Sequence, residues 1–190
     1  MRNILIRFSF FIVFAFLFHQ SFAQKDEICY NPNLIKDTSK KSIKSSAVGV
    51  IGKDSVKIIY HSPGVRKRII WGGLVPYDEV WVTGAHDATT IEFASPFIIN
   101  NVTIPAGKYA LFTIPGKKEW TVIINKNWNQ HLASEYDLKD DIVRVRVKPK
   151  KIPHLERLQY FVEPGRGNDG SLAIAWERVK ISFPFSIIQK

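Results

Sequence analysis

A histidine and an aspartate stand side by side in the segment TGAHDATT, residues 83–90. Both side chains can ligate a metal ion or exchange a proton, so His86 and Asp87 are the first candidates for chemistry. A metal ion would need further ligands, for which the chain offers His61, His131 and His154, but no pair of histidines here has a spacing typical of zinc ligands. Neighbouring residues of a strand point to opposite faces, so both side chains reach one ion only from a turn. The alternative is structural, with Asp87 or Thr89 capping backbone groups where a loop enters a strand.

Aromatic side chains form a second group of candidates, because an exposed ring can offer a stacking face to a sugar or a peptide. The amides of asparagine and glutamine surround Trp128, which suits carbohydrate recognition. Trp120 and Trp176 instead follow the phase of the apolar residues, which predicts packing in the core. The residues proposed for ligand contact are Arg68, Trp71, Tyr77, Trp81, His86, Asp87 and Trp128.

The elements that position these residues are strands. Apolar and polar residues alternate with a period of two in SVKIIYH, TTIEF, EWTVIIN, DIVRVRVK and LAIAWE, and turn signals such as Asn100-Asn101 separate the runs. Many short strands without intervening helices predict an all-β fold, an antiparallel sandwich of jelly-roll type. Residues 127–141 are the exception and are expected to hold one short helical turn.

One long segment does not alternate. Residues 62–87 are dense in glycine, proline and aromatic residues, and their apolar side chains demand burial. Long connections in compact domains commonly carry function. We therefore expect an ordered loop that packs over a sheet face or over an open end of the sandwich.

The start of the chain has the features of a secretory signal peptide, with cleavage expected before Gln24. The apolar run from Phe8 to Phe18 is shorter than the roughly 20 residues that span a bilayer, so no transmembrane segment is expected in the mature chain. Residues 24–46, rich in lysine and serine, are interpreted as a flexible linker, and residues 47–190 as one sandwich domain. The expected location is periplasmic or extracellular.

Composition narrows the choice of partners. Residues 1–23 hold two arginines and no acid, so cleavage lowers the formal charge from +10 to +8. Nucleic acid is a poor partner for an exported protein, whereas an anionic envelope surface could meet the basic run around residues 144–151. The single cysteine, Cys29, excludes an internal disulfide, and no cofactor is expected.

Four segments carry a resemblance to a known family. They are SPGVRKRIIWGGLVPYDEVWVTGAHDATTIEF, IPAGKYALFTIPGKKEWTVIINKNWNQ, RVKPKKIPHLERLQYF and LAIAWERVKISFPF. In this order they resemble domain of unknown function 2911, a family of exported bacterial proteins, from about residue 47 to residue 187. The resemblance implies no particular activity, because none is established for the family. Its members typically read Asn-Glu where this chain has His86-Asp87, and arginine where it has Val82.

Three functions are compatible with these observations. The first is a non-enzymatic extracytoplasmic module that binds a glycan or another small ligand. The second is a hydrolase, metal-assisted or not, that uses His61, His86 and Asp87. The third is an envelope protein that contributes an interaction surface or a structural role.

Overall fold

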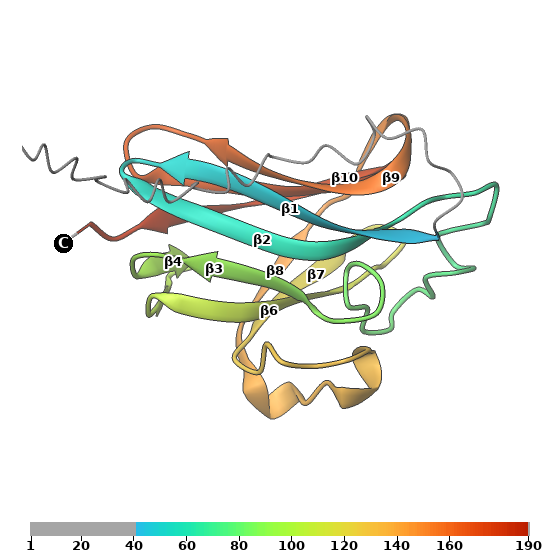
Figure 1. The fold of residues 1–190 in the computed structure, drawn as a ribbon, viewed down its shortest axis with the longest axis horizontal. Helices are drawn as coiled ribbons and strands as arrows, with labels where there is room; N and C mark the ends of the chain where they lie inside the picture. The colour runs from blue at the N-terminus through green and yellow to red at the C-terminus, as the bar shows by residue number, and fades with distance from the viewer. Residues whose placement is uncertain (1–40, 190) are drawn as a thin grey trace, which may run out of the picture.

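The computed structural model describes residues 41–189, and the signal peptide, Cys29 and most of the expected linker lie outside them. Ten strands form two sheets that pack face to face (Figure 1). The six-stranded sheet has the order β1-β2-β3-β6-β7-β8, and the four-stranded sheet has the order β5-β4-β10-β9. The strands are β1 (Ser42–Ile51), β2 (Asp54–Pro63), β3 (Thr89–Phe93), β4 (Phe97–Ile99), β5 (Val102–Ile104), β6 (Gly107–Ile114), β7 (Trp120–Asn125), β8 (Asp141–Val147), β9 (Lys150–Pro164) and β10 (Asp169–Ile187).

The predicted all-β sandwich is confirmed, and its connections add detail. All pairs of neighbouring strands are antiparallel. Consecutive strands pair as hairpins at most positions, as in a meander. The chain changes from one sheet to the other between β3 and β4, between β5 and β6, and between β8 and β9.

The alternation of apolar and polar residues along each strand produces the core between the two sheets. On β2, Val56, Ile58 and Tyr60 point between the sheets and are buried, while His61 lies half-exposed on the other face. Trp120 and Trp176 are 4% and 1% exposed, so their predicted packing role is confirmed. This alternation buries one row of each strand and leaves the other row available for a surface site.

The folded domain begins earlier than the sequence suggested. Strand β1 starts at Ser42 and pairs with β2 from Ser42↔Pro63 to Ile51↔Asp54, so residues 42–46 belong to the sheet and not to a linker. Its first half is rich in serine and lysine, which gives no hydrophobic signal. Backbone pairing with β2 and burial of Ser45 hold this part in place.

Turn chemistry agrees with expectation. Asn100 and Asn101 both have positive φ, 49° and 63°, and connect β4 to β5 through a two-residue turn of the kind that asparagine tolerates. Two short 3₁₀ helices, η1 (Ala133–Glu135) and η2 (Leu138–Asp140), lie in the segment predicted to hold one helical turn. No helix among residues 41–189 is long and apolar enough to cross a membrane.

The six-stranded sheet carries a second apolar cluster on its outer face. Ala110, Phe112 and Ile123 are fully buried there beneath the segments around Val82 and Tyr136. In Figure 1 the segment with η1 and η2 covers this face beside β6. These segments therefore cover part of the outer face, and a pocket forms where the covered part ends.

Candidate functional site

The floor of the pocket is the outer face of the six-stranded sheet. In the register of the sheet, Ile59 of β2 stands opposite Thr90 of β3, and His61 stands opposite Lys44 of β1. Lys108, at the start of β6, lines the same hollow. Each strand places these residues outward because its alternate positions enter the core.

Two loops form the rim. Asp87 ends the connection from β2 to β3, and Trp128 to His131 follow β7. The two segments meet at an isolated antiparallel bridge between Asp87 and His131, where the Ala88 amide also donates to the Gln130 carbonyl at 3.0 Å. They enclose with the floor a hollow of about 440 Å³, which we call the His–Asp pocket. It is lined by Lys44, Ile59, Tyr60, His61, Asp87, Ala88, Thr90, Lys108, Trp128, Asn129, Gln130, His131 and Glu135.

Buried hydrogen bonds at Thr83 hold the turn that carries His86 and Asp87 in place. Thr83 is fully buried, and its carbonyl accepts hydrogen bonds from the Tyr160 hydroxyl at 2.7 Å and from the Thr89 hydroxyl at 3.2 Å. The Thr83 hydroxyl meets that of Thr113 at 2.9 Å. Thr83 and His86 both adopt left-handed backbone conformations, with φ of 53° and 64°. Such conformations cost free energy in a threonine, so the buried bonds must maintain the turn.

Asp87 forms its main contact with a histidine that is distant in the sequence. Its Oδ1 lies 2.9 Å from Nδ1 of His131, and both side chains are exposed. This hydrogen bond, with the nearby charges of His61 and His86, lowers the pKa of the Asp87 carboxyl. Glu135 accepts from the backbone amide of His131 at 2.6 Å and fixes the same loop. The capping role expected of Asp87 is therefore replaced by a side-chain pair, whereas Thr89 does bond the backbone.

His61 and His86 approach each other edge to face, with ring centroids 5.2 Å apart. Burial lowers the pKa of His61, and the neighbouring His86 lowers it further. The His86 Nε2 lies 2.9 Å from the Ser42 hydroxyl, so its ring is directed toward β1. Within residues 41–189, no three His, Cys, Asp or Glu side chains are grouped to hold a metal ion. His61, His86 and Asp87 are thus neighbours but not a ligand set, because other partners orient His86 and Asp87.

Trp128 and Gln130 line the pocket with an indole ring and a side-chain amide. The Trp128 ring is 41% exposed, and the Lys108 ammonium lies over it, 3.9 Å from the ring centroid. Gln130 is 4% exposed, and its amide nitrogen donates to the Asn127 carbonyl and, at 3.3 Å, to Oδ1 of Asn125. Its Oε1 has no donor among the described residues. The aromatic face of Trp128 is thus open to the pocket, whereas the unpaired oxygen of Gln130 is buried behind it.

A second hollow of about 260 Å³ lies next to the first. Its lining is mainly apolar and includes Val75, Trp81, Val82, Leu132 and Trp176. We call it the tryptophan pocket, since behind it Trp71, Trp81, Trp120 and Trp176 pack against one another with centroids 4.9 to 6.5 Å apart. The Trp81 indole donates to the Gly84 carbonyl at 3.0 Å, which ties this cluster to the turn.

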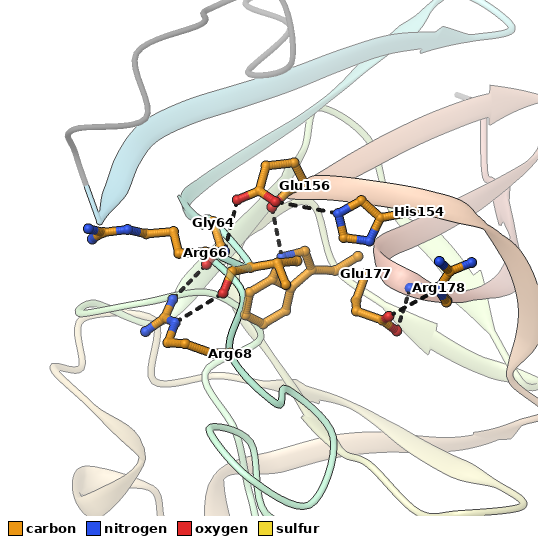
Figure 2. A network of polar contacts seen from close by, with 9 residues as sticks. Gly64, Arg66, Arg68, His154, Glu156, Glu177 and Arg178 are labelled. Carbon is orange, nitrogen blue, oxygen red and sulfur yellow. Dashed lines mark hydrogen bonds and ion pairs between the residues drawn. The ribbon is translucent and has the colours of Figure 1, made fainter.

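Arg68 also lines the tryptophan pocket, but its guanidinium is already engaged. Its Nη2 donates to the Gly64 carbonyl at 2.6 Å and its Nε to the Val65 carbonyl at 3.2 Å. Figure 2 shows this contact beside Glu156, whose carboxylate accepts from the Arg66 amide at 2.9 Å. The network fastens the start of the long loop to β9, so Arg68 acts first as a loop anchor.

The structure divides the seven predicted contact residues into three groups. Asp87 and Trp128 line the His–Asp pocket, and Arg68, Trp81 and His86 line the tryptophan pocket. Trp71 and Tyr77 line neither; Trp71 packs among the other tryptophans, and Tyr77 lies 5.7 Å from the Lys117 ammonium.

Residues that the sequence did not single out complete the pocket, above all Lys44 and Lys108. Lys44 falls in the segment interpreted as linker. Lys108 follows a glycine at the start of a strand and gives no signal by itself. The basic run predicted to meet an envelope surface begins on the edge strand β8 and continues into the start of β9. On β8, Arg144 bonds Asp141 at 2.7 Å and Arg146 lies 3.6 Å from Glu119. Charges on an edge strand also discourage pairing with other sheets.

No curated protein and no solved structure matches the chain. One family model does, over residues 42–185, and its description is protein of unknown function. The match spans the sandwich from the first residue of β1 almost to the end of β10. The chain therefore belongs to the DUF2911 family of proteins of unknown function.

Proposed function

We propose that the chain is exported and that its sandwich domain is a non-enzymatic module that binds a glycan in the His–Asp pocket. The observation that carries this proposal is the exposed ring of Trp128 in one hollow with the polar side chains of Lys108 and Asn129. A sugar presents apolar C–H faces, which stack on an exposed ring, and hydroxyl groups, which exchange hydrogen bonds with amide, ammonium and carboxylate groups such as those that line this hollow. The volume of about 440 Å³ lies within the roughly 300–1,000 Å³ typical of small-molecule sites.

The charges of the pocket agree with a hydroxylated ligand. Lys44 and Lys108 are balanced by Asp87 and Glu135, and both carboxylates already accept hydrogen bonds from His131. The pocket thus carries no strong excess of either sign at neutral pH. Polar groups of both kinds surround the aromatic ring, as recognition of a polyol requires.

Replacing Trp128 by alanine tests the proposal. The variant is titrated calorimetrically with a panel of methyl glycosides and short oligosaccharides, alongside the wild type. Loss of a stacking partner worth about 1.4 kcal/mol corresponds to about tenfold weaker binding. Phe161→Ala is the matched control, because Phe161 is 37% exposed on β9 and has the Lys180 ammonium 5.6 Å away. Equal affinities of wild type and Trp128→Ala would contradict the proposal.

One contact favours a second function, acid–base catalysis. The 2.9 Å bond from Asp87 to Nδ1 of His131 leaves the His131 Nε2 without a partner among residues 41–189, as in a general base oriented by a carboxylate. This pair replaces the combination of His61, His86 and Asp87 expected for a hydrolase. Turnover of nitrophenyl esters or glycosides that is lost in both His131→Gln and Asp87→Asn would support catalysis, and unchanged turnover in His131→Gln would exclude it.

A further inference from the structure

The two pockets share one thin wall, to which three chain segments contribute. Each segment gives one residue to either side: Ser42 and Lys44 on β1, His86 and Asp87 in the turn, and His131 and Leu132 after β7. The first pocket receives Lys44, Asp87 and His131, and the second receives Ser42, His86 and Leu132. The wall between the His–Asp pocket and the tryptophan pocket is therefore about one residue thick.

Hydrogen bonds link the three segments into a continuous ridge. The His86 Nε2 meets the Ser42 hydroxyl at 2.9 Å, and the His86 carbonyl accepts from the Leu132 amide at 3.0 Å. Asp87 and His131 complete the ridge through their side-chain contact. His86 is itself exposed, so a ligand that extends from one pocket into the other would pass over this side chain.

The tryptophan pocket is suited to an apolar group. The rest of the protein buries Trp176, Val75 and Val82 almost completely. The small part of each side chain that stays accessible lines the hollow. Two cations line it: Arg68 already donates to two carbonyl groups of its own loop, and Lys41 is exposed just before β1. Transfer of an apolar substituent from water to such a lining is favourable by about 0.8 kcal/mol per buried methylene.

From this arrangement we infer that the two pockets are subsites of one site and that the ligand is an amphiphilic glycan. The sugar occupies the His–Asp pocket, and a short apolar substituent, such as an acyl or alkyl group, crosses the ridge into the tryptophan pocket. This inference rests on the proposed function, since the sugar anchors the ligand. The inference adds to that function an apolar substituent on the sugar, which binding of a plain sugar in the His–Asp pocket would not require.

Matched pairs of glycosides test the inference. Methyl and hexyl glycosides of the same sugars are titrated into the wild type by calorimetry, with the hexyl compounds kept below micelle formation. One buried methylene corresponds to roughly fourfold in affinity. We expect the hexyl glycoside of each bound sugar to bind at least tenfold more tightly than its methyl counterpart. Equal affinities would overturn the inference while leaving sugar binding intact, whereas failure of all glycosides to bind would overturn the proposed function itself.

Variants that fill the tryptophan pocket make the test specific. Ala85 and Leu132 line it and are not fully buried, so Ala85→Phe and Leu132→Phe should each erase the hexyl advantage and leave methyl glycoside affinity unchanged. Ala94→Phe, at an exposed position just beyond the opposite end of β3, is the matched control and should preserve the advantage. A hexyl advantage that survives both pocket-filling variants, with their folds verified by thermal melting, would place the alkyl chain elsewhere and contradict the inference.

Discussion

The buried hydroxyl of Tyr160 links the core of the sandwich to the candidate site, and Tyr160→Phe measures that link. The hydroxyl donates to the Thr83 carbonyl at 2.7 Å, while the ring packs on Tyr60 with centroids 4.6 Å apart. Phenylalanine keeps the ring contact and removes only the donor. The Thr83 carbonyl retains the weaker bond from Thr89 at 3.2 Å, so we expect a loss of about 1 kcal/mol in the free energy of unfolding.

Two readouts separate a local effect from a global one. A loss of about 1 kcal/mol lowers Tm by roughly 2–4 °C in a domain of this size. Hydrogen exchange should also accelerate at the amides of Ala88 and Thr89, which bond to the Gln130 and Val82 carbonyls. Both amides lie in the segment that Thr83 anchors.

Tyr109→Phe is the control for this experiment. Its hydroxyl donates to the Pro105 carbonyl at 2.8 Å, remote from the turn that carries His86. The variant should lower Tm comparably and leave exchange at Ala88 and Thr89 unchanged. If Tyr160→Phe also leaves their exchange unchanged, the buried hydroxyl does not maintain the turn with its left-handed residues.

Three further perturbations test the packing and the electrostatics. Gly49→Ala should cost about 1–3 kcal/mol in unfolding experiments, because a Cβ there would lie 2.5 Å from the Cβ of Val162, whereas the exposed Val50→Ala should stay within about 0.5 kcal/mol. Trp176→Ala should cost about 3–5 kcal/mol and Trp128→Ala much less, because the first ring is 1% exposed and the second 41%; similar losses in urea denaturation would contradict the assigned roles. Burial lowers the pKa of His61, so the unfolded chain takes up its proton first and stability falls as the pH drops below the ordinary value of 6.5. Tm should therefore decrease between pH 7.5 and pH 5.5, and it should decrease less in His61→Gln; an equal decrease in both proteins would show that His61 is not the group responsible.

The strands could be predicted from the sequence because alternation records which face of each strand is buried. Val56, Ile58 and Tyr60 are an example, and so is the turn at Asn100-Asn101, where residue type alone selects the backbone conformation. The start of β1 could not be predicted in this way. Backbone pairing holds it there, and its serines and lysines resemble those of a linker.

The candidate site was predictable only in part, since it depends on which loops meet. His86, Asp87 and Trp128 could be selected by residue type, but the partner of Asp87 is 44 positions away and no spacing rule identifies it. Trp71 and Trp81 were expected to present ligand faces because they lie in a loop. The loop folds back over the core, so Trp71 packs between Trp120 and Trp176 and Trp81 shows only part of its ring.

Titration of the ¹⁵N-labelled protein with a glycan panel, followed by NMR, locates the residues that a bound glycan contacts. Binding in the His–Asp pocket predicts that the largest shifts occur at the Trp128 indole, at the Gln130 side-chain amide and at the amides of residues 87 and 131. No shifts with any glycan, or shifts confined to the basic strand β8, would contradict the assignment of this pocket as the binding site.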